Sequence, residues 1–151
     1  MANSQAMCTS FKGEILSGIH ALGTTVIRAG TGADTLKAAL YLASSSQGAA
    51  TTAYGISGEV SGTGYSAGGV TITNANPPTT SGTTGYWTPS ASFTYTTVTL
   101  TTAFDAVLVY NSTQSNKAIS VHTFQSQTIT AGTFTLTMPT SDSTNALLRI
   151  A

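Results

Sequence analysis

The stretch from Phe104 to Pro139 constrains the fold more than any other part of the sequence, because apolar and polar residues alternate along most of it. Successive side chains of a β-strand point to opposite faces, so this alternation gives one apolar and one polar face. The alternating apolar positions are Val107, Val109, Ile119, Val121, Phe134, Leu136 and Met138. A polar loop at 111–116 separates the first two runs, and a second break precedes the third. We therefore predict a two-stranded hairpin followed by a separate third strand over 131–139.

Weaker patterns predict further strands and one short helix. The strands are expected at 24–28, 34–43, 70–73, 93–100 and 145–151, with a turn at 29–33. The segment 34–43 also has the composition of a helix, and we interpret it as a strand because the rest of the chain is β. One helical face is predicted from Phe11, Ile15, Leu16 and Ile19, with Thr9 or Ser10 as its cap and Gly18 or Gly23 at its end.

These elements predict an all-β fold with one short N-terminal helix. A chain of 151 residues forms one domain around one core. About eight or nine short strands with turn residues between them are typical of a sandwich of two sheets. We predict a single-domain β-sandwich over 11–151, of jelly-roll type, preceded by a loose arm over 1–10.

The surface of this protein must carry very little charge. Only 7% of the residues are Asp, Glu, Lys or Arg, against about 25% in typical domains, and the formal net charge is zero. Five scattered basic residues form neither a nucleic-acid interface nor a polybasic membrane patch. So little charge also gives little protection against self-association. We expect a protein that assembles into something larger, with a homodimer favoured over a trimer.

The first residues do not combine a basic segment with a long apolar stretch, and the sequence has no apolar run of roughly 18 residues. We therefore expect synthesis in a cytoplasm, without export and without a membrane span.

Ionisable side chains are too few and too scattered to predict an active site. The carboxylates are Glu14, Asp34, Glu59, Asp105 and Asp142, and no two of them are close in sequence. We interpret His122 as a hydrogen-bonded structural histidine beside Ser120, and His20 as a residue that interacts with the end of the helix. Cys8 is the only cysteine, which excludes an intrachain disulfide and a cysteine zinc site. We predict no catalytic residue, no metal and no cofactor, and hence no enzyme.

Two loop segments need separate interpretation. The segment 58–73 contains five glycines, but no helix is predicted after Gly62-Thr-Gly64 and no Gly-Lys-Ser/Thr follows, so we interpret it as a structural turn rather than a phosphate-binding loop. The segment 74–89 is expected to be a long surface loop that ends in Tyr86 and Trp87. Adjacent aromatic residues can anchor a loop, cover a partner or stack on a sugar, and packing is the default.

Several segments resemble a known family. They are Phe11-Lys-x-Glu-Ile-Leu-x-Gly-Ile-His20, Lys37-Ala-Ala-Leu-Tyr41, Gly58-Glu-Val-Ser-Gly-Thr-Gly-Tyr-x-Ala-Gly-Gly-Val-Thr71, Phe104-Asp-Ala-Val-Leu-Val-Tyr-Asn111 and Lys117-Ala-Ile-Ser-Val121. Together they resemble small virion structural proteins of tailed bacteriophages, including capsid decoration or cement proteins, over about residues 11 to 151.

The resemblance implies a β-sandwich on the outer face of a phage head, where it would stabilise the shell by bridging major capsid subunits. It implies no catalytic motif. We expect the arm 1–10 or the loop 74–90 to dock on the capsid or on a sister copy, with Phe11, Tyr86 and Trp87 as possible interface residues. The alternative is a tail-associated or receptor-binding module in which Tyr86 and Trp87 contact host glycans. A secreted carbohydrate-binding domain and an enzyme rank lower.

Overall fold

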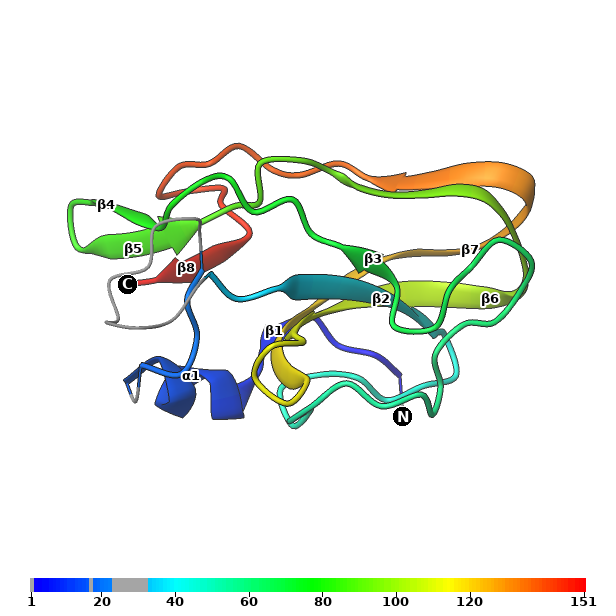
Figure 1. Cartoon of the computed structure of the whole chain (residues 1–151), viewed down its shortest axis with the longest axis horizontal. Coiled ribbons are helices and arrows are strands. Elements are labelled where there is room, and N and C mark those ends of the chain that lie inside the picture. The colour runs from blue at the N-terminus through cyan, green and yellow to red at the C-terminus, as the bar shows by residue number, and fades with distance from the viewer. Residues whose placement is uncertain (1, 17, 23–32) are drawn as a thin grey trace.

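The computed structural model describes residues 2–16, 18–22 and 33–151. These residues form one helix and eight strands, and Figure 1 shows their arrangement. The elements are β1 (Ala6–Met7), α1 (Thr9–Leu16), β2 (Leu36–Leu42), β3 (Val70–Thr71), β4 (Thr79–Ser81), β5 (Thr84–Trp87), β6 (Phe93–Asn111), β7 (Lys117–Leu136) and β8 (Leu148–Ile150). The fold is therefore all-β with one short helix, as predicted. The strand predicted at 24–28 and most of the turn at 29–33 lie outside the described residues.

The long hairpin of β6 and β7 is the centre of the fold. Its antiparallel register runs from Asn111↔Lys117 beside the turn to Phe93↔Leu136 at the far end. The sequence predicts the hairpin correctly but divides it into too many strands. The segments 93–100 and 104–110 are one strand, and so are 117–124 and 131–136. The ladder continues because the extra residues at the irregular positions form β-bulges, after which the two strands pair again.

The bulges bend the hairpin. Thr97 in β6 and Ala131 in β7 both have left-handed backbones, with φ values of 53° and 47°, and the register shifts beside both of them. Figure 1 shows the consequence: the ribbon doubles back at one end of the molecule, so that its two halves lie in two layers. Aromatic rings fill the space within the bend, where the rings of Phe104 and Phe134 lie 5.2 Å apart, edge to face.

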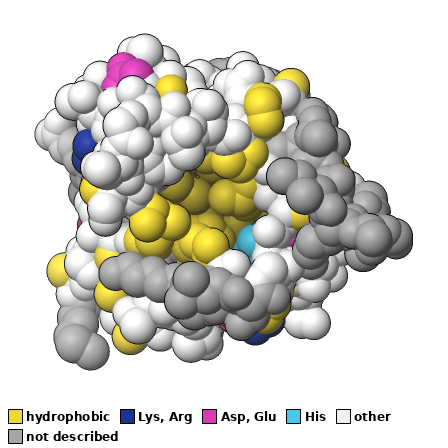
Figure 2. All heavy atoms as spheres, turned by 90° about the vertical axis from the view of Figure 1, so that its left-hand side faces the viewer, with side chains coloured by type: hydrophobic (Ala, Val, Ile, Leu, Met, Phe, Trp, Pro, Cys, Tyr) yellow, Lys and Arg dark blue, Asp and Glu magenta, His cyan; other side chains and the backbone are white. Residues whose placement is uncertain are grey.

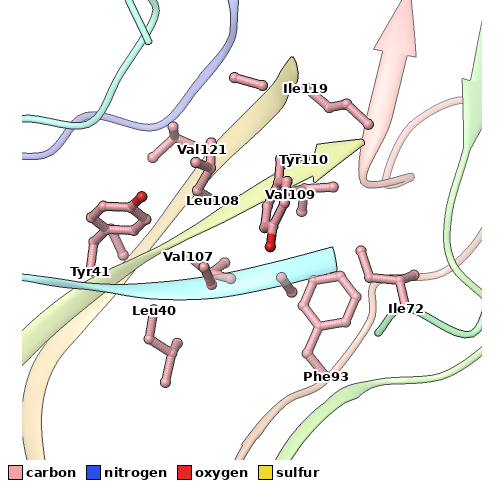
Figure 3. Close-up of a cluster of buried hydrophobic side chains, with 14 of the residues drawn as sticks. Leu40, Tyr41, Ile72, Phe93, Val107, Leu108, Val109, Tyr110, Ile119 and Val121 are labelled. Atoms are coloured by element: carbon pink, nitrogen blue, oxygen red, sulfur yellow. The ribbon is translucent and has the colours of Figure 1, made fainter. Parts of the chain in front are cut away.

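Two antiparallel sheets contain all eight strands. The larger sheet has the order β1-β7-β6-β2-β3, and the smaller has the order β4-β5-β8. Strand β2 confirms the strand interpretation of 34–43. Its central residues are buried on both faces, which explains why the sequence lacks a polar alternation there. Figure 3 shows the core, in which β2, β6 and β7 contribute Leu40, Tyr41, Val107, Leu108, Val109, Tyr110, Ile119 and Val121.

The prediction of a loose arm over 1–10 is wrong for the residues that the structure describes. Ala6 and Met7 pair with the outer edge of β7, and Cys8 is completely buried. The side chain of Asn3 accepts hydrogen bonds from Ser45 Oγ and the Gln47 amide, both at 2.7 Å. The small polar side chains of this segment do not predict an ordered structure, and the pairing of its backbone with β7 is not visible in a local pattern.

Helix α1 is shorter than expected and ends where the sequence predicts. The amide of Gly18 donates to the Ile15 carbonyl and that of Ile19 to the Glu14 carbonyl, and Gly18 has a φ of 66°. This is a Schellman motif, which favours glycine because its backbone is left-handed. The predicted cap is not formed, because the helix already includes Thr9 and the buried Ser10 hydroxyl has no hydrogen-bond partner among the described residues.

Much of the segment 74–89 lies on the surface, as expected, but it is not an irregular loop. It contains β4 and β5, and β5 also pairs with β8 near the carboxyl terminus. Trp87 is buried, and its indole N–H lies 3.1 Å from Asn74 Oδ1 and 3.0 Å from the Asn76 carbonyl oxygen. These hydrogen bonds fold the loop back onto its own tryptophan.

The glycine-rich segment 58–73 serves backbone packing. A Cβ atom at Gly62 or Gly64 would overlap the carbonyl oxygen of Thr99 or Thr97 in β6, and one at Gly69 would overlap the Ala38 carbonyl in β2. Only glycine lets two backbones approach so closely. No helix follows these glycines in the structure, in agreement with the interpretation as a structural turn.

The same segment completes the second edge of β2. The Leu40 carbonyl accepts from the Val60 amide, and the Leu42 amide donates to the Gly58 carbonyl. Between these bonds and β3, tyrosine hydroxyls take the place of a strand. Tyr95 donates to the Ala38 carbonyl at 2.8 Å, and the Tyr65 hydroxyl accepts from the Leu40 amide at 3.0 Å. Because Ala38, Leu40 and Val60 are buried, their backbone groups would be costly without these hydrogen bonds.

Glu59 holds this tyrosine cluster in place. Its Oε1 accepts from the Tyr65 hydroxyl and from the Gly68 amide, and its Oε2 accepts from the Tyr54 hydroxyl, each at 2.7 Å. The carboxylate is buried with 7% of its surface exposed. Burial, together with the hydrogen bond to Glu59, raises the pKa of Tyr54 and of Tyr65, so both remain protonated donors at neutral pH.

We predict that Gly69→Ala lowers the free energy of unfolding by more than about 3 kcal/mol. The new methyl group would overlap the Ala38 carbonyl, and the left-handed backbone of residue 69 is itself unfavourable for alanine. Gly55→Ala is the matched control, since its Cβ would meet nothing within 4 Å, and it should change stability by less than about 0.5 kcal/mol. Urea unfolding followed by far-UV circular dichroism measures both. Equal stability of the two variants would contradict the close packing.

We also predict that Glu59→Leu destabilises the fold by at least about 3 kcal/mol, because two tyrosine hydroxyls and the Gly68 amide lose their acceptor. Glu59→Gln should cost clearly less, since its amide oxygen can still accept from Gly68. The same urea titration compares them. A glutamine variant as unstable as the leucine variant would show that hydrogen bonding is not what Glu59 contributes.

Candidate functional site

The candidate site is an apolar groove between α1, residues 18–22, and the sheet β4-β5-β8. It has a volume of about 610 Å³, within the range of roughly 300–1,000 Å³ that is usual for binding clefts. Figure 2 looks into this hollow and shows its apolar side chains. Its apolar walls come from Ile15, Leu22, Pro77, Pro78, Leu148 and Ile150. None of the described residues that line it is Asp, Glu, Lys or Arg.

All three residues predicted for an interface line this groove, although they come from distant parts of the sequence. Phe11 extends from α1, and Tyr86 and Trp87 from β5. Phe11 has no exposed surface and Trp87 only 2%, so these two form the floor of the groove. Tyr86 is partly exposed. Of the three, Tyr86 is the residue that a partner can touch without a rearrangement.

His20 forms part of the groove wall, and its two ring nitrogens are both engaged. Nε2 lies 2.7 Å from Glu14 Oε2, and Nδ1 lies 3.1 Å from Asn111 Nδ2. The amide orientation of Asn111 is fixed, because its Oδ1 accepts from the amides of Thr113 and Gln114. Asn111 Nδ2 is therefore a donor to His20 Nδ1, which places the neutral ring's proton on Nε2, facing Glu14.

Charged groups behind the wall fix the segment that carries His20. Lys117 Nζ lies 2.6 Å from Glu14 Oε1 and joins the start of β7 to α1. Burial disfavours the charged form of Glu14, but the hydrogen bonds from Lys117 and His20 outweigh it and lower the pKa of Glu14. Asp34 Oδ2 accepts from the Ala21 amide at 2.7 Å and from Asn111 Nδ2 at 2.8 Å. The network positions the groove wall and leaves no proton donor or acceptor of His20 directed into the groove.

A second hollow of about 520 Å³ lies beside β1 and β7 and contains Ser120 and His122. The Ser120 hydroxyl and His122 Nε2 are 2.9 Å apart, in agreement with the interpretation of His122 as a hydrogen-bonded histidine beside Ser120. Burial lowers the pKa of His122 to about 4, so the ring is neutral at pH 7. A serine nucleophile also needs a group that orients the histidine, and no carboxylate among the described residues hydrogen-bonds to this ring. We therefore assign the pair no catalytic role.

Cys8 and the metal-binding residue types offer no further site. Cys8 is completely buried, and burial, with the charge of Glu14 as a smaller cause, raises the pKa of its thiol to about 11. A thiol with so high a pKa is not a reactive nucleophile at neutral pH. Within the described ranges, no three side chains of His, Cys, Asp or Glu come together in a way that could hold a metal ion.

Sequence reasoning missed the groove and the charged network behind it. Glu14, Asp34 and Lys117 are far apart in sequence, and no local pattern places them together. The fold brings them to one end of the molecule through Asn111 and His20. The small number of charged side chains could have indicated the network. A buried charged side chain needs a specific partner, and this chain has few candidates for each pairing.

Comparison with known proteins adds no assignment. No family model, no curated protein and no solved structure matches this chain. Among the described residues, no helix is long and apolar enough to cross a membrane.

We predict that acid destabilises the protein through His122. Its pKa is about 4 in the folded chain and about 6.5 when unfolded, so between these pH values only the unfolded chain takes up the proton. Stability contributed by the neutral ring is therefore present above pH 6.5 and is lost as the pH falls, by about 2 kcal/mol at pH 5.

His122→Gln keeps a hydrogen-bonding side chain beside Ser120 without titrating. Urea unfolding at pH 7.5, 6.0 and 5.0 should show a steeper loss of stability in the wild type than in this variant. Parallel losses in the two proteins would rule out His122 as the cause.

Proposed function

We propose that this chain is a structural virion protein, most specifically a capsid decoration or cement protein of a tailed phage. In this role it binds the outer surface of the head and bridges major capsid subunits. The proposal begins from the family resemblance of its sequence. The observation that carries it is the apolar groove, which offers contact area to a partner and whose described lining residues include no Asp, Glu, Lys or Arg.

The distribution of charge supports a role in assembly. The segments 88–104 and 118–141 contain no Asp, Glu, Lys or Arg, although they form most of the central hairpin. Many of their outward side chains are exposed threonines, such as Thr94, Thr96, Thr133 and Thr135. Such a surface can form hydrogen bonds and van der Waals contacts but does not attract a partner electrostatically over a distance. It suits a partner that is bound through shape complementarity and buried area.

The fold and its assembly are further parts of the proposal. We propose that the doubled-back hairpin is the frame of a β-sandwich of the jelly-roll type. The protein would be made in the host cytoplasm and end in the virion as a homo-oligomer, with a dimer favoured over a trimer. The segments 1–10 and 74–90, which we expected to dock, contain β1, β4 and β5. Deleting either would therefore damage a sheet, and point substitutions are the better test.

The tail-associated, glycan-binding alternative loses its main support. It required Tyr86 and Trp87 to present rings to a sugar, and Trp87 is buried with its indole N–H already bonded. Tyr86 alone is a weak stacking platform. The walls that the described residues form are apolar and uncharged, which is also a poor match for a polyhydroxylated ligand.

We predict that the purified protein saturates undecorated heads of the phage that encodes it, at hundreds of copies per particle and a simple ratio to the major capsid protein. Co-sedimentation followed by quantitative gel analysis gives the ratio. The absence of binding, with only a few to a few dozen copies in the virion, would reject the decoration role and move the protein to the tail.

A further inference from the structure

We propose that the outer edge of β8 and the groove beside it together bind an extended, uncharged segment of another polypeptide of the virion shell. The bound segment adds a strand to the sheet β4-β5-β8 and places alternate side chains in the groove. This inference rests on the proposed function and specifies how the contact is made.

The first argument is the position of β8 in its sheet. It pairs with β5 on one side through Trp87↔Leu148, Tyr86↔Arg149 and Gly85↔Ile150, and it is the last strand in the order β4-β5-β8. No described strand pairs with its other edge. Proteins usually protect such an edge with charged residues, proline or a bulge, and β8 has only Arg149.

The second argument is that this edge and the groove adjoin. Leu148 and Ile150 are two residues apart in β8 and both line the groove, so they lie on one face of the strand. Ile150 is 50% exposed and is one of only two large apolar side chains so exposed among the described residues. A polypeptide strand laid along β8 satisfies both features, because its backbone pairs with the edge and its alternate side chains enter the groove.

The third argument concerns charge. The described residues that line the groove offer no charged side chain to an occupant, and the two nitrogens of His20 are already bonded to Glu14 and Asn111. A charged side chain placed there would lose its hydration without gaining a partner. The side chains that enter must therefore be uncharged and mainly apolar.

The same reasoning disfavours a second copy of this chain as the occupant. A symmetric antiparallel pairing of β8 with its counterpart, aligned over all three residues, would place Arg149 directly opposite Arg149 of the other copy. Like charges directly opposite one another destabilise a strand pair. A different polypeptide avoids this repulsion.

Site-directed crosslinking tests the inference on undecorated heads. Ile150→Cys carries a benzophenone maleimide at the groove, and Ile56→Cys is the matched control, because Ile56 is 72% exposed and does not line the groove. Cys8 is completely buried and should not react in the folded protein. After irradiation, we expect a covalent product with a shell protein from position 150 and at least tenfold less from position 56. Mass spectrometry should locate the link in an uncharged, apolar stretch.

Each other outcome overturns the inference. Products that join two copies of this chain would identify a homotypic contact, and equal yields from both positions would show that the groove is not the docking surface. If unlabelled wild-type protein binds the heads while position 150 gives no product, only the groove assignment fails. If the wild type does not bind at all, the proposed function fails with it.

A second measurement avoids the chemical label. Ile150→Lys should lower head occupancy at least tenfold at a fixed protein concentration, because it brings a charge to the groove. Ile56→Lys adds the same charge elsewhere and should bind like the wild type. Both positions are exposed, so neither variant is expected to unfold. Undiminished occupancy of the Ile150→Lys variant would contradict strand addition at β8.

Discussion

The contact between Glu59 and its surrounding tyrosines is the constraint on which the rest of the structure depends. Strand β2 lies inside the fold, yet β3 covers only part of its second edge. The remaining backbone groups would be buried without partners if Tyr65 and Tyr95 did not reach them. Glu59 fixes Tyr65, and the absence of side chains at the nearby glycines brings their backbone within reach. One carboxylate thus lets a loop without regular strands act as the missing neighbour of a sheet.

This arrangement also explains how a chain with so few charged residues uses them. Glu59 organises the tyrosine cluster, and Glu14 with Lys117 and His20 fixes α1 to the start of β7. Glu59 is buried and the Glu14 side chain is 12% exposed, whereas Lys117 reaches the surface. Threonine, serine, asparagine and glycine supply most of the polarity of the chain. The groove between α1 and the smaller sheet is the place where apolar side chains reach that surface as a group. Glu59, Glu14 and Lys117 therefore stabilise the fold, whereas the surface available to a partner at the groove is apolar.

Much of the fold follows from local patterns, and the failures have physical causes. Alternation identified the central hairpin, and Gly18 marked the end of the helix. Bulges at Thr97 and Ala131 shift the alternation by a residue, which reads in the sequence as a break although the ladder continues. The order of residues 2–10 comes from the backbone pairing of Ala6 and Met7 with β7 and from the side chains of Asn3 and Cys8, whose neighbours lie far away in the sequence. The groove was beyond prediction because it joins Phe11 to residues more than seventy positions away.

The position of Trp87 gives the molecule an optical property of its own. It is the only tryptophan in the chain, and it lies buried at the floor of the groove with its N–H bonded to the loop before β5. The indole emission of the native protein therefore originates from a single environment, next to the surface proposed for docking and away from the bend of the long hairpin. Fluorescence excited near the red edge of its absorption therefore reads the state of that one end of the molecule, where Tyr86 also lies, while the other five tyrosines lie outside the groove lining.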